Sequence, residues 1–172
     1  GDALTYSTTS TEINIDASTG LLSFIIAPDY ETKYLYSADI RVTDGGQTPD
    51  FGTVTVNVNN LNDNIPSITS SATFTADENQ TSVGTITASD ADNDDLSFSI
   101  SGNDAGSFVI GSSTGVLEFI QAFDYENDTS QREQSIVVNV TDGVNEVSQN
   151  VAVTLNNIND NSPVFTTSTE WQ

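Results

Sequence analysis

The chain has 172 residues, and 25 acidic side chains against 3 Lys and Arg give it a formal net charge of −22. Nucleic acid and anionic membranes both need clustered cations, so this charge excludes them as direct partners. The sequence has no Cys and no His, which excludes disulfides, thiolate metal sites and the commonest general base, and leaves oxygen atoms as the available metal ligands. The sequence shows no signal peptide or membrane span, so we expect any targeting segment to lie outside this chain.

Short β-strands are predicted along the whole chain, because runs of Val, Ile, Thr, Phe and Tyr alternate with turn residues. Period-two alternation is clear at Val54, Val56 and Val58. Between residues 66 and 161 we predict seven strands, at 68–74, 83–88, 96–101, 108–111, 116–120, 135–141 and 147–156. No window combines a 3.6-residue apolar period with helix caps, so we expect little helix. The aromatic residues expected in the core are Phe24, Tyr36, Phe98, Phe108 and Phe119.

The sequence also contains an internal repeat. Residues 60–66, Asn-Leu-Asn-Asp-Asn-Ile-Pro, return at residues 157–163 as Asn-Ile-Asn-Asp-Asn-Ser-Pro, a spacing of 97 residues. Further echoes are Asp-Tyr-Glu at 29–31 and 124–126 and Val-Thr-Asp-Gly at 42–45 and 140–143. A unit of this size is typical of a β-sandwich with one core.

These patterns predict an all-β chain of tandem Greek-key β-sandwiches, of which the first is truncated. Residues 1–64 form a partial copy that lacks its first two strands, and residues 65–161 form a complete copy. Residues 162–172 supply the first strand of a following copy, in which Trp171 matches the core residue Phe74. We therefore interpret the chain as an excerpt from a longer array.

The repeated acidic segments resemble the calcium-binding signature of cadherin repeats. Asp-x-Glu, the Asn-x-Asn-Asp-Asn linker, an x-Glu-x segment at Glu78 and Asp-x-Asp at 90–92 occur in the order found in that family, and the resemblance covers the whole chain. It implies an immunoglobulin-like topology and a non-enzymatic adhesion role at the cell surface or outside the cell. The implied partners are calcium and neighbouring repeats or other copies of the same protein, including homophilic contacts. The Asp-Tyr-Glu version and the lack of Cys are more similar to bacterial surface or secreted proteins, which implies a bacterial adhesin with a membrane-anchored parent.

The resemblance also implies a ligand set at the junction of the first two copies. The ions nearer the first copy would be held by Asp29, Glu31, Asp63 and the Leu61 carbonyl, with Asp92 reaching across. The ion nearer the second copy would be held by Asn62, the Asn64 carbonyl, Asp90, Asp92, Asp142 and a carbonyl near Asn93. Such mixtures of carboxylate, amide and carbonyl oxygens suit calcium. Of the ions implied at this junction, the one near Asp90, Asp92 and Asp142 is the best supported by the residues present.

At the end of the second copy the resemblance implies half of this set again. The residues concerned are Glu78, Asp124, Glu126, Asn159 and Asp160. Two departures weaken the predicted sites: the linkers open with Asn60 and Asn157 where the family has Asp, and the first copy lacks the x-Glu-x segment. We expect the half-site at the end of the second copy to bind weakly or to hold one ion.

Other interpretations of the acidic residues are less favourable. An EF-hand at Asp90, Asp92 and Asp94 is rejected because Asp95 stands where glycine is needed and Ser101 where the bidentate glutamate belongs. A glycosidase pair is rejected because the two acids of Asp-x-Glu are two residues apart on a loop.

Two alternative functions stay open at this point. A carbohydrate-binding module attached to a polysaccharide-degrading enzyme would make polysaccharide a partner, with Tyr30, Tyr125 and Trp171 as its aromatic candidates. A strand-donating filament subunit would use the unpaired edges of residues 1–64 and the predicted strand at 164–169.

Overall fold

The computed structural model describes residues 3–46 and 48–165, and the chain divides into two compact units, Gly1–Asp63 (unit 1) and Asn64–Gln172 (unit 2). The described residues form fourteen β-strands, labelled β1 to β14, and two short 3-10 helices, η1 (Ala105–Ser107) and η2 (Thr129–Gln131). The all-β prediction and the expectation of little helix are therefore confirmed.

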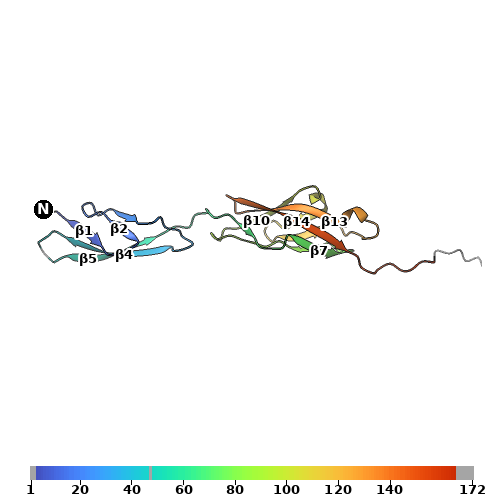
Figure 1. Ribbon diagram of the computed structural model, residues 1–172, viewed down its shortest axis with the longest axis horizontal. Helices are drawn as coiled ribbons and strands as arrows, with labels where there is room; N and C mark the ends of the chain where they lie inside the picture. Colours follow the sequence, from blue (N-terminus) through green and yellow to red (C-terminus); the bar gives the residue numbers. More distant parts are fainter. Residues whose placement is uncertain (1–2, 47, 166–172) are drawn as a thin grey trace, which may run out of the picture. The chain divides into compact units, whose positions relative to one another are not determined.

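Unit 2 is a two-layer sandwich (Figure 1). One sheet has the order β10 (Ser97–Ser101), β13 (Glu133–Thr141), β14 (Glu146–Asn156), β7 (Thr73–Asp77). The other has the order β11 (Phe108–Ile110), β12 (Val116–Phe119), β8 (Ser82–Thr85), and a short ladder joins β6 (Ser67–Ile68) to β9 (Ala88–Ser89). β7 runs parallel to β14, whereas all the other pairs in this unit are antiparallel.

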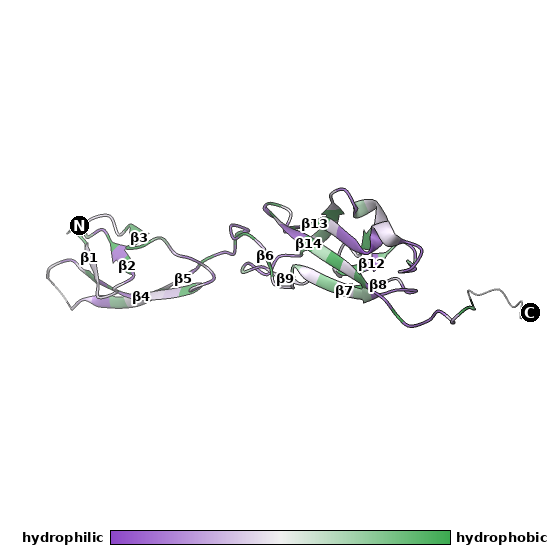
Figure 2. Ribbon diagram, turned by 45° about the vertical axis from the view of Figure 1, so that its right-hand side comes forward, coloured by the Kyte–Doolittle hydropathy of each residue, from purple (hydrophilic) through white to green (hydrophobic). Residues whose placement is uncertain are grey.

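The two sheets of unit 2 enclose one core because their strands alternate in polarity. On β14, Val151, Val153 and Leu155 are buried, while the residues between them are exposed. They share one cluster with Leu117 and Phe119 of the opposite sheet. Figure 2 shows apolar stretches on strands such as β7 and β14, and polar residues along many of the loops. Full burial of each such side chain contributes about 1.5–3 kcal/mol to the stability of the unit.

Two of the seven predicted strands of unit 2 are each divided in the structure. The predicted strand 68–74 is β6 and β7, and the predicted strand 83–88 is β8 and β9. The division arises because the segments pair with different partners: β7 joins β14, whereas β6 joins β9. A chain that changes partner has to leave the ladder between the two pairings, and between β6 and β7 it does so through the small residues 69–72. The other five strands agree with the prediction to within two residues.

Unit 1 also contains two sheets (Figure 1). One has the order β1 (Thr5–Thr8), β4 (Leu35–Thr43), β5 (Asp50–Asn57), and the other pairs β2 (Ile13–Ile15) with β3 (Leu22–Phe24). Its buried centre is small and consists of Ile13, Ala38 and Ile40. Within the described part of this unit β5 pairs only with β4 and β3 only with β2, whereas β14 and β12 of unit 2 have the further partners β7 and β8. The truncation of the first copy stays a prediction that accords with this pairing.

The expected core aromatics lie at or beside these two centres. Phe98, Phe108 and Phe119 are buried in unit 2. Phe24 and Tyr36 pack against the centre of unit 1, with their rings edge to face at a centroid distance of 5.0 Å. Trp171 and most of the predicted strand at its end of the chain lie outside the described residues.

Candidate metal centres

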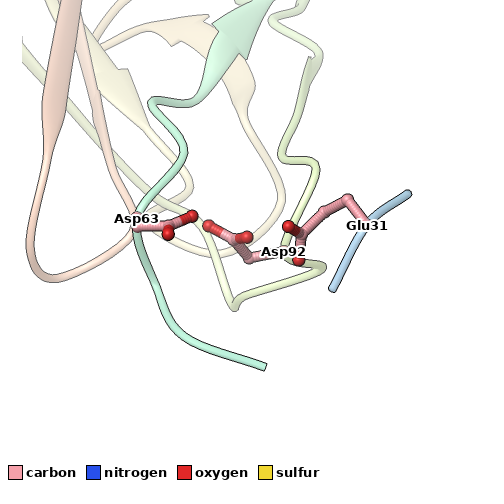
Figure 3. Close-up of side chains that lie close together, drawn as sticks. All are labelled: Glu31, Asp63 and Asp92. Atoms are coloured by element: carbon pink, nitrogen blue, oxygen red, sulfur yellow. The ribbon is translucent and has the colours of Figure 1, made fainter. Parts of the chain in front are cut away.

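The first acidic group lies in unit 2, on the loop between β9 and β10. Asp92 is 3% exposed and projects from this loop (Figure 3). Its Oδ2 accepts a hydrogen bond from the Asn64 backbone N–H at 2.8 Å, and its Oδ1 accepts one from Asn64 Nδ2 at 2.8 Å. Asp90 Oδ1 accepts a bond from the Asp92 backbone N–H at 2.9 Å. These bonds tie the loop to the first residue of the unit.

The turn after β13 adds a third predicted ligand to this end of unit 2. Asp142 is 9% exposed, and its Oδ1 accepts bonds from the backbone N–H groups of Val144 at 2.7 Å and Asn145 at 2.6 Å. Gly143 permits the turn with its positive φ of 95°. Asn145 Nδ2 also donates to the Asn64 carbonyl at 3.0 Å. Hydrogen bonds thus connect Asn64, Asp90 and Asp92, and Asn145 links Asp142 to Asn64; the role of these residues as metal ligands stays a prediction.

A carboxylate that the sequence analysis did not assign completes the group. Asp90, Asp92 and Asp94 each offer an oxygen, and these oxygens all lie within 4.8 Å of one another. The Oδ2 atoms of Asp90 and Asp94 are buried and have no hydrogen-bond partner among the described residues. Burial raises the pKa of the Asp94 carboxyl, and the carboxylates of Asp90, Asp92, Asp142 and Asp95 raise it further. The Asp-x-Asp-x-Asp spacing of residues 90–94 is the sequence signal for this carboxylate, although it does not fit an EF-hand.

Asn93 lies between two of these acids in the sequence but differs from them in backbone conformation and exposure. Its backbone is left-handed with φ 62°, its side chain is exposed, and its Nδ2 donates to the Ala91 carbonyl at 3.3 Å. Asparagine tolerates this backbone conformation better than most residues. The prediction of a carbonyl ligand near Asn93 stays untested.

The second group of predicted ligands belongs to unit 1. The carboxylate oxygens of Glu31 and Asp63, both labelled in Figure 3, lie within 4.8 Å of each other. Asp29 shapes the loop before β4: its Oδ1 accepts from the Glu31 backbone N–H at 3.1 Å, and its Oδ2 accepts from the Thr32 hydroxyl at 2.9 Å. The Thr32 hydroxyl is the main cause that lowers the pKa of Asp29. Asp29 is therefore charged and orients the backbone that carries Glu31.

The linker residues 60–63 of unit 1 form an irregular segment after β5. The Leu61 carbonyl accepts a bond from the Asp63 backbone N–H at 3.0 Å. Asn60 is exposed and Asn62 is half-buried, both in the irregular segment after β5. The predicted ligand set of this segment stays a proposal.

The third group also lies in unit 2 and brings together three segments that are far apart in the sequence. Oxygens of Glu78, Glu126 and Asp160 lie within 4.8 Å of one another. Glu78 is 1% exposed, and it accepts the backbone N–H of Tyr125 at 2.6 Å on Oε2 and that of Ile158 at 2.7 Å on Oε1. A buried carboxylate with these bonds joins the loop after β7, the loop after β12 and the terminal linker.

Two other predicted residues stand beside this third group. Asp124 is not among its three clustered carboxylates; its Oδ1 accepts the backbone N–H of Asn127 at 2.9 Å, which is the main cause that lowers the pKa of Asp124. Asn159 is exposed in the linker. Asn157, which replaces the family's Asp, donates from Nδ2 to Glu126 Oε1 at 2.7 Å. Asn at this position therefore carries one negative charge fewer than Asp would and donates a hydrogen bond to a carboxylate oxygen of the group.

The chemistry of all three groups fits a hard divalent cation. The donors are carboxylate, amide and carbonyl oxygens, which calcium accepts in sets of six to eight. Carboxylates this close repel one another and lose hydration, and a buried oxygen without a donor is unfavourable unless a cation lies beside it. The buried oxygens of Asp90 and Asp94 are the clearest instance of this condition in the described residues.

Comparison with known proteins identifies the family. The sequence pattern of the cadherin domain matches residues 71–156, half of the chain. The chain belongs to the cadherin family. This result confirms the predicted family, the sandwich fold and the expectation that the chain is not an enzyme, because cadherin relatives are adhesion and structural proteins.

The similar proteins are large cadherins of animals. Human Protocadherin Fat 1 is 34% identical over 171 residues, which cover 90% of this chain but 4% of that protein. The Drosophila melanogaster Fat-like cadherin-related tumor suppressor homolog is 32% identical over 151 residues, covering 83% of this chain and 3% of that protein. The chain thus spans only a few per cent of the relatives it matches. They lend no support to the bacterial assignment.

Solved structures show the same cadherin fold. Protocadherin Gamma B2 extracellular cadherin domains 3–6 match with a TM-score of 0.79 and 24% identity over 98% of this chain and 44% of that one. Mouse Cadherin-23 EC22–24 matches with a TM-score of 0.78 and 21% identity, over 91% of this chain and 53% of that one. Membership of the cadherin family, whose relatives include protocadherins of the cell surface, supports the predicted extracellular or cell-surface location. Among the described residues no helix is long and apolar enough to cross a membrane.

Proposed function

We propose that this cadherin segment is a calcium-dependent structural and adhesion module, in which calcium stiffens the junction between its two units. The proposal is supported by the acidic group of unit 2, in which oxygens of Asp90, Asp92 and Asp94 lie within 4.8 Å of one another. The Oδ2 atoms of Asp90 and Asp94 are buried and have no hydrogen-bond donor among the described residues. A group of this kind is stable when a cation neutralises it.

The chain sequence supports a shared site at the junction. The boundary between the units falls between Asp63 and Asn64, which are consecutive residues. Asp63 belongs with Glu31 in unit 1, and Asn64 is bonded to Asp92 in unit 2. One peptide bond therefore joins two incomplete sets of oxygen ligands. A calcium ion that draws on both sets would fix the orientation of the units.

Electrostatics gives the direction of the effect. Two unit charges 4 Å apart interact by about 1 kcal/mol in water and about 4 kcal/mol at the lower effective dielectric of a protein surface. Without a cation, acids of both units favour separation, and the chain carries a net charge of −22. Calcium reverses the sign of this interaction, so binding and interdomain rigidity are coupled.

Small-angle scattering tests the proposal. We expect the full chain to give a longer maximum dimension and a sharper rod-like profile in calcium than in EGTA, at constant ionic strength. The Asp90→Ala, Asp92→Ala double variant should scatter like the chelated chain under both conditions. Identical wild-type profiles with and without calcium would contradict the proposal.

The chain spans only a few per cent of the cadherin relatives it matches, so an adhesive role is a proposal here. We propose that its contacts are made with neighbouring repeats or with other copies of the same protein. The comparisons give no support to a carbohydrate-binding module or to a strand-donating filament subunit.

A further inference from the structure

Unit 2 contains three copies of the sequence pattern for N-linked glycosylation, Asn-x-Thr, which begin at Asn79, Asn127 and Asn139. In this modification an oligosaccharide is joined to Nδ2 of an asparagine in a secreted protein. Membership of the cadherin family supports an extracellular location for the chain, so the modification is available to it. Because the oligosaccharide is bulky and hydrated, the surroundings of each asparagine in the folded unit determine which copy is compatible with it.

Asn139 lies in β13, between β10 and β14, and it is half-buried. Its Nδ2 donates to the Ser101 hydroxyl at 3.1 Å, and its Oδ1 accepts from the Ser148 hydroxyl at 2.8 Å. Both ends of the amide are therefore held by side chains of the neighbouring strands. An oligosaccharide on this nitrogen would have to displace those side chains, so the fold disfavours Asn139 as the acceptor.

Asn79 is exposed in the turn after β7, but its backbone and its side chain are both held. Its backbone N–H donates to the Phe123 carbonyl at 2.8 Å, and its Nδ2 donates to Asp160 Oδ2 at 2.7 Å in the terminal linker. Asp160 belongs to the third acidic group together with Glu78, the residue before Asn79. An oligosaccharide here would lie between the turn and the linker, so this copy is also disfavoured.

Asn127 has the surroundings that the modification requires. It is exposed in the loop between β12 and β13, and Thr129, the third residue of its pattern, is exposed at the start of η2. Its Nδ2 donates to Asp124 Oδ2 at 2.6 Å, and its backbone N–H donates to Asp124 Oδ1 at 2.9 Å. An asparagine amide has two N–H bonds, and the sugar replaces one of them. The other stays available for Asp124.

Unit 1 shows that one hydrogen is enough for this contact. Asp29 and Asp124 open the two copies of the repeated Asp-Tyr-Glu segment, and Thr32 follows the first copy as Asn127 follows the second. The Thr32 hydroxyl donates to Asp29 Oδ2 at 2.9 Å, in the place of the Asn127 amide. A hydroxyl has a single hydrogen to donate. The loop of unit 2 can therefore keep its bond to the aspartate when one N–H of Asn127 is left.

The loop of unit 2 is also longer beyond this contact. In unit 1 the Tyr34 carbonyl accepts the backbone N–H of Val58 at 2.8 Å, and in unit 2 the Arg132 carbonyl accepts that of Leu155 at 2.8 Å. Val58 and Leu155 are separated by the repeat spacing of 97 residues. Tyr34 comes three residues after the Asp-Tyr-Glu segment, whereas Arg132 comes six residues after it. The extra residues lie next to Asn127, in a surface loop of the kind that tolerates a bulky addition.

We propose that Asn127 is the N-glycosylated residue of this chain and that Asn79 and Asn139 stay unmodified. The oligosaccharide projects into solvent from the loop between β12 and β13, while the remaining N–H of Asn127 keeps its bond to Asp124. Its bulk covers this loop, so any adhesive contact of unit 2 has to use another surface. The modification goes beyond the proposed calcium function and does not require calcium.

The full chain, secreted from cultured animal cells, tests this assignment by mass spectrometry before and after treatment with PNGase F, which releases N-linked oligosaccharides. We expect the wild-type chain to carry one oligosaccharide, and peptide mapping to locate it at Asn127. Asn127→Gln and Thr129→Ala should both lose the whole oligosaccharide mass. Thr129→Ala keeps the asparagine and its bond to Asp124, so it separates loss of the acceptor pattern from loss of that bond. Thr129→Ser preserves the pattern and should stay modified.

Asn79→Gln and Asn139→Gln are the matched controls, and both should keep the wild-type oligosaccharide mass. Circular dichroism checks that each variant folds. A wild-type chain that leaves the cells without an oligosaccharide would overturn the proposal. So would an oligosaccharide that persists in Thr129→Ala, or one that peptide mapping locates at Asn79 or Asn139.

Discussion

Chelation of calcium is expected to lower the free energy of unfolding of unit 2 by about 4 kcal/mol, relative to the chain at a calcium concentration 1,000-fold above its Kd. The physical reason is that calcium binds the assembled carboxylates of the folded state, whereas the unfolded chain holds them apart. For a domain of this size the melting temperature should fall by roughly 15 °C. Differential scanning calorimetry in calcium and in EGTA measures the difference.

Magnesium is the matched control for this prediction. It has the same charge but requires a smaller, more nearly octahedral shell and gives up its water reluctantly. At the same concentration and ionic strength it should restore little of the lost stability. Superimposable melting curves in calcium and EGTA would contradict the prediction that calcium binding stabilises unit 2.

Substitution of Glu78 by Gln is expected to destabilise unit 2 by about 1–3 kcal/mol even without calcium. Glu78 is 1% exposed, and its two oxygens accept the backbone N–H groups of Tyr125 and Ile158. A glutamine at this position has one acceptor oxygen, and its NH2 group faces the other backbone N–H. One buried backbone N–H therefore loses its acceptor. Chemical denaturation in EGTA measures this structural contribution apart from metal binding.

Glu118→Gln provides the control, since Glu118 lies on β12 of the same unit and is exposed. Its substitution should change the stability by less than about 0.5 kcal/mol. Equal stability of the Glu78 and Glu118 variants would show that the buried carboxylate is not the link between the loops. A loss of stability in the Glu78 variant alone would support its role as the link between the loops that carry Tyr125 and Ile158.

Much of the fold was predictable because the repeat and the period-two patterns are local signals. The alternation of Val151, Val153 and Leu155 specifies both a strand and its buried face. The exchange of partners between β6 and β7 was not predictable, since it depends on which strands lie at the edges of the two sheets. Residues 69–72 carry no proline or glycine to mark it.

The candidate metal ligands were likewise only partly predictable from the sequence. The paired acids Asp90 and Asp92 followed from the family motif, and the structure places them together. The burial of the Asp94 Oδ2 atom depends on packing of the loop, which no spacing rule reveals. Likewise, the donation from Asn157 to Glu126 required knowing that a linker and a distant loop meet.

Calcium is proposed to fix the two units relative to each other, and a distance distribution between them tests this most directly. The chain has no Cys, so Thr55→Cys in unit 1 and Thr154→Cys in unit 2, both exposed strand positions, can carry the only two spin labels. Electron–electron double resonance should give one narrow distance peak in calcium and a broad distribution in EGTA. Equally broad distributions under both conditions would contradict the account.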